Sequence, residues 1–267
     1  IRFGVIADTQ KSVKMVHSKL AKIIKPQLPT LNAMIHLGDV VAYGGQKKNW
    51  LEYFDVASVY LSDIPQMTVL GNHEYYLSRG SYYNQLPKEF KDYMRGSSDK
   101  MPGFVSYDFP QVRFIMLNSN LTKMKRVDQR RQMAWFKEQL EITKKIKKNV
   151  IVCLHHSIFT STHIISPVVN KRLIGKYLPV LESYPHIKLV LSGHQHLYER
   201  SEYKGSTYLS LGPAGGIYSN AHRDNKFQRV VAEKASTVTF FTIDSRSIDL
   251  VSYDHNNKII DRHKIML

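Results

Sequence analysis

The sequence is poor in cysteine and has no long hydrophobic run. Its single cysteine, Cys153, lies in the apolar segment NVIVCL, so an internal disulfide is excluded and we expect a buried thiol. No stretch approaches the roughly 18 consecutive apolar residues that suggest a membrane-spanning helix. Internal repeats, low-complexity tracts and long linkers rich in proline, glycine or serine are also absent. These absences predict one domain over residues 1–267 without a transmembrane segment.

Acidic residues are scarce relative to basic ones. The chain has 38 lysines and arginines against 22 aspartates and glutamates, which gives a formal net charge of +16. Such a charge attracts nucleic acid, a membrane surface or an anionic substrate. The basic residues are spread along the chain, and the one dense cluster, KKIKK at 144–148, ends a predicted helix, where cations complement the helix dipole. We therefore interpret this cluster as a solvated helix end, and the net charge alone selects none of the three partners.

Short β-branched segments alternate with helical patterns through most of the length. The expected strands are 1–7, 33–37, 66–70, 103–109, 112–118, 150–154 and 187–191, and the expected helices are 13–24, 50–61, 129–145 and 168–183. A short Pro-Gln turn between the strands at 103–109 and 112–118 predicts a hairpin. After residue 205 the pattern changes to short strands, at 207–211, 237–243 and 247–253. The sequence therefore predicts an α/β domain with a β-rich C-terminal part.

Residues of the types that bind metal ions follow five of these strands. In chain order they are Asp8-Thr9-Gln10, Gly38-Asp39, Gly71-Asn72-His73-Glu74, His155-His156 and Gly193-His194-Gln195-His196. Each motif alone is weak, because an aspartate after a strand is more often a helix N-cap. Together they indicate a metal site at the carboxyl edge of the sheet, where α/β proteins place their sites. Side chains two residues apart in an extended segment point the same way, so we expect His194 and His196 to share this site.

The order of the five motifs resembles that of the calcineurin-like metallophosphoesterase superfamily, over residues 1 to about 216. Four further segments are similar to the purple acid phosphatase branch: GHQHLYER, the hairpin GFVSYDFPQVRFIMLNS, the helix QMAWFKEQL and the glycine-rich LGPAGG. The resemblance implies an α/β fold of a particular kind. It is a four-layer α/β/β/α sandwich of two mixed β-sheets flanked by helices.

The resemblance also implies a centre of two divalent or trivalent metal ions. One ion would be held by Asp8, Gln10 and His196, the other by Asn72, His155 and His194, with Asp39 bridging both. His155 is preferred to His156 because it is the first histidine after its strand, where the family's ligand stands. Two carboxylates and three imidazoles favour Mn, Fe or Zn over Ca or Mg.

The sequence departs from the purple acid phosphatase pattern at two positions. That branch usually has glycine where Gln10 stands and a tyrosine ligand three residues after the bridging aspartate. Here the second position is Ala42, and a tyrosine follows one residue later as Tyr43. We infer that Gln10 supplies the ligand that tyrosine would otherwise provide, so the protein should not be purple. Glutamine at this position also occurs in branches that resemble nucleotide-diphosphate hydrolases.

Two histidines are expected to act on the substrate. His73 follows Asn72 and, by the resemblance, faces the phosphate, where it would stabilise the transition state or protonate the leaving oxygen. His163 lies eight residues after His155, at about the offset of substrate-facing histidines in purple acid phosphatases, and a surface-loop position is the equal alternative. His36 lies within a strand and is expected to be a core histidine.

These expectations together favour hydrolysis of phosphomonoesters by a metal-bridging hydroxide. Two ions about 3.5–4 Å apart stabilise both the attacking and the leaving oxygen of an in-line displacement. A phosphodiesterase or nucleotide pyrophosphatase on the same scaffold is the alternative, and a nuclease is less favoured because no nucleic-acid-binding motif accompanies the charge. A non-catalytic, metal-stabilised binding protein is the alternative of another class, although such a protein would have no use for His73.

The expected partner is a small anionic phosphorylated substrate or a phosphoprotein, with nucleic acid unsupported by any motif and the oligomeric state left open. The features shared with purple acid phosphatases slightly favour a periplasmic or secreted protein over a cytoplasmic one, and because the first residue, Ile1, is not methionine, the compartment is left open.

Overall fold

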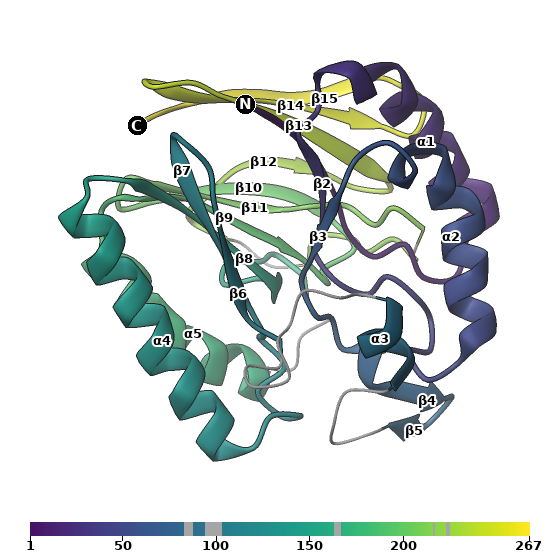
Figure 1. The fold of residues 1–267 in the computed structure, drawn as a ribbon, viewed down its shortest axis with the longest axis horizontal. Helices are drawn as coiled ribbons and strands as arrows, with labels where there is room; N and C mark the ends of the chain where they lie inside the picture. Colours follow the sequence, from purple (N-terminus) through teal and green to yellow (C-terminus); the bar gives the residue numbers. More distant parts are fainter. Residues whose placement is uncertain (83–87, 94–102, 163–166, 216, 223–224) are drawn as a thin grey trace.

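Two β-sheets pack face to face, and helices cover both outer faces (Figure 1). The computed structural model describes residues 1–267 except 83–87, 94–102, 163–166, 216 and 223–224. The six-stranded sheet has the order β15-β14-β13-β1-β2-β3, and the seven-stranded sheet has the order β12-β10-β11-β9-β8-β7-β6. Both sheets contain parallel and antiparallel pairs. This arrangement is the predicted four-layer α/β/β/α sandwich.

The six-stranded sheet combines strands from both ends of the chain. Its strands are β1 (Arg2–Ile6), β2 (Ala33–His36), β3 (Gln66–Thr68), β13 (Thr237–Ile243), β14 (Ser247–Asp254) and β15 (Ile259–Met266). The first three run parallel to one another, and β13 to β15 continue the sheet antiparallel from β1. Helices α1 (Ser18–Ile24) and α2 (Lys47–Leu61) cover its outer face, and a π-helical turn (Val13–His17) leads into α1 (Figure 1).

The seven-stranded sheet has a parallel centre, formed by β7, β8, β9 and β11. Its strands are β6 (Val105–Asp108), β7 (Val112–Leu117), β8 (Asn149–His156), β9 (Ile187–Gly193), β10 (Tyr198–Tyr203), β11 (Ser206–Ser210) and β12 (Gln228–Ala232). Helices α4 (Arg126–Lys145) and α5 (Pro167–Ser183) cover its outer face (Figure 1). A small hairpin, β4 (Tyr76–Ser78) and β5 (Ser81–Tyr82), and the short helix α3 (Lys88–Tyr93) lie outside both sheets.

Alternation along the strands sorts apolar side chains into three layers. In β8, Ile151 and Cys153 face the layer between the sheets, whereas Val150 and Val152 pack beneath α4 and α5. Strands buried on both faces are continuously apolar, which is why this segment has no polar alternation. Cys153 is fully buried, as expected, and burial raises the pKa of its thiol.

The expected strands and helices are present, but several elements were not predicted. The sequence analysis missed β10, β12 and β15, whose segments YERSEY, QRVVA and IIDRHKIM mix charged and apolar residues. Such strands are decided by their partners across the sheet more than by their own pattern. Helices α2 and α4 also begin three residues earlier than expected, because their first turns are polar. None of the helices among the described residues is long and apolar enough to cross a membrane.

A buried polar network links the two sheets just after the GHQH motif. On β10, the Tyr198 hydroxyl bonds Ser252 Oγ at 2.8 Å and donates to Asp261 Oδ2 at 2.9 Å. Arg200 Nε donates to the same Asp261 oxygen at 2.7 Å. Since Ser252 and Asp261 lie on β14 and β15, these bonds cross from one sheet to the other. Tyr198 and Arg200 therefore have a structural role behind the loop that carries the GHQH motif.

A buried histidine anchors the start of the first helix. His17 is fully buried, its Nε2 lies 2.9 Å from the Tyr60 hydroxyl, and its ring stacks on Tyr53. Burial lowers the pKa of His17 to about 3. The folded protein therefore holds this ring neutral, whereas the unfolded chain protonates it below about pH 6.5.

Replacing Tyr198 by phenylalanine removes a hydroxyl that serves both sheets. We expect Tyr198→Phe to lower the free energy of unfolding by about 1–2 kcal/mol, because Asp261 is left with one bond fewer in a buried setting. Tyr203→Phe is the matched control, since its hydroxyl donates to Glu182 near the surface. The measurement is urea denaturation of both variants, and an equal loss in the two would contradict a special role for the inter-sheet network.

Stability should fall in acid partly because of His17. Between pH 7 and pH 5 the unfolded chain gains a proton at this residue and the folded chain does not, which costs about 2 kcal/mol. His17→Gln keeps a hydrogen-bonding group that does not titrate, so this variant should lose about 2 kcal/mol less than the parent over the same interval. Urea denaturation at the two pH values tests this, and identical pH dependence of the two proteins would show that His17 is not the cause.

Candidate metal centre

The carboxyl ends of five strands from both sheets meet at one place. Asp8 and Gln10 follow β1, Asp39 follows β2, Asn72 follows β3, His155 lies at the end of β8, and His194 and His196 follow β9. Ligand atoms of Asp39, His155 and His194 lie within 4.8 Å of one another, and so do those of Asp8, Asp39 and His196. Asp39 belongs to both groups. The structure thus brings together all seven residues that the sequence analysis expected as metal ligands.

In the first group, His155 is the centre of the contacts. Its Nε2 lies 3.1 Å from His194 Nδ1, 3.2 Å from Asn72 Oδ1 and 3.3 Å from Asp39 Oδ2. Its Nδ1 donates to the Leu37 carbonyl at 2.7 Å, so in the neutral ring Nε2 carries a lone pair. Lone pairs that face one another at this spacing need a proton or a metal ion between them. Ligand atoms that each lie about 2.0–2.2 Å from one ion are separated from one another by distances similar to the 3.1–3.3 Å found around His155.

The second group contains two buried oxygens that lack a partner. His196 Nε2 lies 3.6 Å from Asp8 Oδ1, and Gln10 Nε2 lies 3.2 Å from His196 Nε2. Asp8 Oδ1 and Gln10 Oε1 form no hydrogen bond with any described residue. A 180° turn of the Gln10 amide exchanges its oxygen and nitrogen and directs the oxygen towards Asp39 and His196. Because unpaired buried oxygens are costly, this donor set fits a bound cation.

Two members of the first group, Asp39 and His194, are in the charge states that bind metal. Although burial opposes ionisation, His155 and then His73 hold the pKa of Asp39 well below its usual value. Burial, followed by the charges of His156 and His155, lowers the pKa of His194, so this ring is neutral. An ionised carboxylate and a neutral imidazole are the forms that coordinate metals. Although burial lowers the pKa of His155, the charge of Asp39 raises it to about 9, so a metal ion would displace a proton from this ring.

Four of the seven candidate ligands have left-handed backbone. The φ angles are +54° at Asp8, +54° at Asp39, +68° at His194 and +52° at His196. Such conformations cost about 1–3 kcal/mol each and cluster at functional sites. They also correct one expectation: β9 ends at Gly193, and His194 and His196 share the site because the chain turns at both residues, rather than because it is extended.

Glycines allow the loops to approach the ligands closely. A Cβ at Gly71 would overlap the side chain and backbone of Asp39, and a Cβ at Gly193 would lie 2.7 Å from Asp8 Oδ2. At Gly38, φ is +89° and a Cβ would lie 2.8 Å from His155 Nδ1. The three strand ends therefore pack at a separation that any side chain would prevent.

Glu74 supports the centre from beneath, a role that the sequence analysis did not assign. Its Oε2 accepts from the backbone N–H groups of Asp39 at 2.9 Å and Gly71 at 2.7 Å, and its Oε1 accepts from Val40 at 2.8 Å. Burial, followed by the charge of Asp39, raises the pKa of Glu74 to about 8, and the backbone donors act in the opposite direction. The one sequence signal was a charged residue inside the motif GNHE.

Of the two histidines expected to act on the substrate, His73 lies beside the centre. Its backbone N–H donates to Asp39 Oδ1 at 2.8 Å, and its Nδ1 donates to the Ala42 carbonyl at 2.8 Å. This orients Nε2 towards Asp39 Oδ2, at 3.8 Å, with the side chain 19% exposed. His163 lies outside the described residues.

The remaining histidines near the centre have supporting positions. His156 Nδ1 bonds Ser119 Oγ at 2.8 Å, and its ring packs 4.3 Å from that of His194. It belongs to neither ligand group. His36 is a buried core histidine, as expected, and its Nε2 donates to Thr9 Oγ1 at 3.0 Å.

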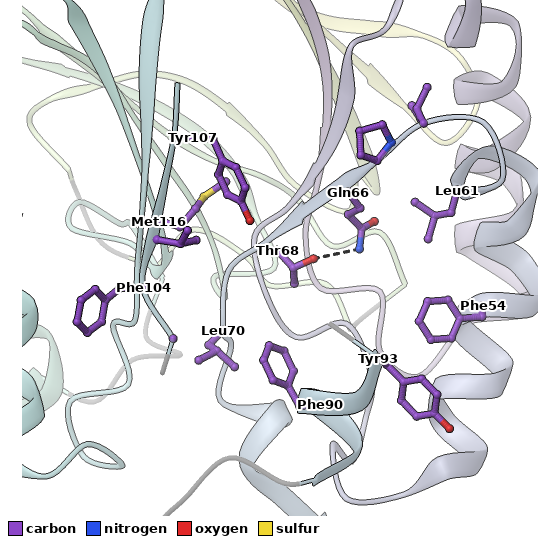
Figure 2. A pocket seen from close by; sticks show the side chains of 14 residues that line it. Phe54, Leu61, Gln66, Thr68, Leu70, Phe90, Tyr93, Phe104, Tyr107 and Met116 are labelled. Carbon is purple, nitrogen blue, oxygen red and sulfur yellow. Dashed lines mark hydrogen bonds between the residues drawn. The ribbon is translucent and has the colours of Figure 1, made fainter. Parts of the chain in front are cut away.

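Two cavities lie near these loops, and they differ in relation to the centre. Figure 2 shows one of about 240 Å³ between α2, β3, α3 and the strands β6 and β7, lined by aromatic side chains such as Phe90 and Phe104. None of the predicted site residues that the structure describes lines it. The other, of about 580 Å³, includes His73 and Tyr43, so Tyr43 faces a cavity beside the centre.

A family model described as calcineurin-like phosphoesterase matches residues 1–198. A search of curated proteins found no match.

Solved structures with a fold similar to that of this chain include the following three. GAP50, described as the anchor in the inner membrane complex of Plasmodium, has a TM-score of 0.78 and 18% identity, covering 100% of this chain and 89% of that one. Purple acid phosphatase PPD1 from yellow lupin has a TM-score of 0.79 and 16% identity, covering 99% of this chain and 53% of that one. A dimetal phosphatase from Danio rerio has a TM-score of 0.66 and 13% identity, covering 100% and 98%. At these identities the likeness concerns the fold.

The close approach of Gly71 to Asp39 gives a test of the centre. We expect Gly71→Ala to displace the Asp39 carboxylate, to abolish stoichiometric metal binding and to lower stability by about 1–3 kcal/mol through overpacking. Gly175→Ala in α5 is the matched control, because nothing lies within 4 Å of the added methyl, and it should gain about 0.5–1 kcal/mol. Metal content and thermal unfolding are measured together, and a Gly71→Ala protein that binds two ions normally would contradict the assignment.

Proposed function

This chain belongs to the calcineurin-like phosphoesterase family, and we propose that it is a metal-dependent phosphomonoesterase with a dinuclear centre. The observation that carries the proposal is the sharing of Asp39 between two groups of ligand atoms, with His73 directly beside it. A purely structural metal site needs one closed set of ligands. Two sets joined by one carboxylate suit a centre that holds a substrate phosphate.

In the proposed centre, Asn72, His155 and His194 hold one ion, and Asp8, Gln10 and His196 hold the other, with Asp39 shared. Bound ions of the Mn, Fe or Zn type would polarise the phosphate oxygens and lower the pKa of a water nucleophile. The two carboxylates contribute −2, and the other ligands are neutral, so the ligands only partly offset the charge of two ions. The centre therefore keeps a net positive charge for an anionic substrate.

His73 is proposed to act on the leaving oxygen. Because Nδ1 is held by the Ala42 carbonyl, the ring presents Nε2 to the space beside Asp39. When protonated, Nε2 can donate to a phosphate oxygen or pass a proton to the departing group. The backbone N–H of His73 donates to Asp39 Oδ1. The orientation of the Asp39 carboxylate is therefore linked to that of the His73 ring, the proposed general acid.

Two other functions remain as candidates. A phosphodiesterase or nucleotide pyrophosphatase would use the same residues, and the glutamine at position 10 favours it. A metal-stabilised binding protein is favoured by the similar fold of a protein described as an anchor.

The test is hydrolysis by chelated protein that has been reconstituted with Mn²⁺, Fe²⁺ or Zn²⁺. The substrates are p-nitrophenyl phosphate, bis-p-nitrophenyl phosphate and ADP-ribose. Preference for the monoester supports the proposal, and preference for either of the others favours the second activity. Metal binding that stabilises the fold without any turnover would favour the binding protein.

His73 should be needed for turnover and not for metal binding. We expect His73→Ala to lower kcat by about 10²–10⁴-fold while metal content stays at the level of the parent, because proton transfer is lost and the ligands remain. His255→Ala is the control, because His255 lies at the turn after β14, away from the candidate centre. Loss of metal together with activity in His73→Ala would show that the residue supports the centre instead of acting on the substrate.

A further inference from the structure

The cavity beside His73 is positively charged. Its lining consists of Lys11, Tyr43, His73, Tyr76 and the turn at 78–81, and we call it the basic pocket. Two cations, Lys11 and Arg79, contribute to this lining, and no carboxylate does. Its volume of about 580 Å³ suits a group much larger than a phosphate. Because His73 belongs to this lining and also lies beside Asp39, the pocket adjoins the candidate centre, and one molecule can place a phosphate at the centre and a second group in the pocket.

Within the part of the chain that the structure describes, the two cations have no protein counter-charge. Neither Lys11 nor Arg79 forms an ion pair or a side-chain hydrogen bond with any described residue, although nine pairs of lysine or arginine with a carboxylate occur elsewhere in the described part of the chain. They come from different loops and converge on one cavity. Unpaired cations that share a concave surface attract an anion more strongly than the same charges spread over a convex one.

The backbone holds Lys11 in a strained position next to the centre. Its φ is +78°, and the Ser12 N–H bonds the Gln10 carbonyl at 3.2 Å, which makes a γ-turn of the rare, strained kind. The same N–H bonds the Gly215 carbonyl at 2.8 Å, which keeps the turn in place. Strain of this type persists where the surroundings enforce it, and it clusters at binding sites.

The hairpin that carries Arg79 is fixed to the loop that carries Tyr43. The Gly45 N–H donates to the Tyr76 carbonyl at 3.0 Å, and Gln46 Nε2 donates to the Leu77 carbonyl at 3.0 Å. Arg79 lies in the two-residue turn between β4 and β5, where Gly80 has φ of +79°. The tip of the hairpin is thereby held over the pocket.

Two tyrosines give the pocket flat, partly apolar surfaces. The Tyr76 ring packs edge-on against His73 with 4.8 Å between centroids, and its hydroxyl accepts from Asn72 Nδ2 at 3.2 Å. Tyr43 lines the pocket as well. Tyrosine rings bind planar groups by stacking or edge contacts. A ligand that fits this lining has a planar body and an anion.

We propose that the basic pocket binds the leaving group of the substrate, and that Lys11 and Arg79 select aromatic phosphomonoesters whose leaving group carries a second anion. This inference rests on the proposed function. It assigns the phosphate of the substrate to the candidate centre, and the anion on the leaving group to Lys11 and Arg79. The contacts are made before and during the reaction alike, so they lower KM more than they raise kcat.

The test compares 4-carboxyphenyl phosphate with 4-carbamoylphenyl phosphate, which differ in one charge and little in shape. The reconstituted protein should prefer the carboxylate, by about fivefold or more in kcat/KM and chiefly through KM, and the preference should shrink at high salt. The double variant Lys11→Gln/Arg79→Gln should bring the ratio of the two kcat/KM values close to one. The control Lys14→Gln/Lys19→Gln removes the same charge from exposed positions outside the pocket and should keep the preference.

The outcomes separate this inference from the proposed function. If neither ester is hydrolysed, the phosphomonoesterase proposal fails, and the pocket is tested by calorimetric binding of the inert 4-carboxyphenylphosphonate and 4-carbamoylphenylphosphonate. A preference for the carboxylate that depends on Lys11 and Arg79 supports the pocket in either assay. Equal kcat/KM or affinity for the two compounds in the parent protein, or an equal loss of preference in the control variant, overturns it.

Discussion

The architecture around the centre depends on one buried carboxylate, Asp39, which both ligand groups share. Asp39 has almost no exposed surface, yet its Oδ2 lies 3.3 Å from His155 Nε2 and 3.4 Å from Gln10 Nε2, and its Oδ1 accepts from the His73 N–H. A buried carboxylate requires compensating positive charge or hydrogen bonds. Here the contacts come from both sheets, because His155 ends a strand of the seven-stranded sheet and Gln10 and His73 follow strands of the six-stranded sheet. The packing of the sheets and the chemistry of the centre are therefore one constraint, because each ligand group draws on both sheets and a shift of either sheet would separate ligands within both groups.

The cost of this arrangement lies in the backbone, and the surrounding packing offsets it. Left-handed φ angles at Asp8, Asp39, His194 and His196 would relax in a short peptide. They are held by glycines that let strand ends approach, by Glu74 beneath two of the loops, and by the Tyr198–Asp261 bond that joins the sheets. Rigid strands thus position the side chains, and strained turns direct them. Such a division suits a site whose ligands must be in place before a substrate arrives.

Two of the many basic residues of this protein, Lys11 and Arg79, lie in the cavity beside the candidate centre. A net charge of +16 spread over a surface attracts any polyanion weakly. Lys11 and Arg79 line a cavity that has no carboxylate in its lining and that includes His73, beside the candidate centre. The proposed centre would bind the phosphate common to all substrates of its class, whereas the basic pocket would distinguish one leaving group from another. Binding of the common phosphate and selection of the leaving group would then reside in separate groups of residues.

The sequence alone determined most of the strands that build the two sheets, though not β10, β12 and β15, and the metal-binding residue types at the ends of five of them. Buried strands such as β1 and β8 have apolar runs that need no partner to be recognised, and the five motifs after them stand in an order that resembles one superfamily, which the family match confirms. Tertiary structure decided the rest. The extended geometry expected for His194 and His196 was wrong, because the chain turns at both residues to reach two groups of ligands. The support by Glu74 and the pairing of Lys11 with Arg79 around one cavity left no local pattern. Periodicity along a chain records which face of an element is buried, whereas the contact of two loops depends on how whole sheets pack, and that is a property of many distant residues at once.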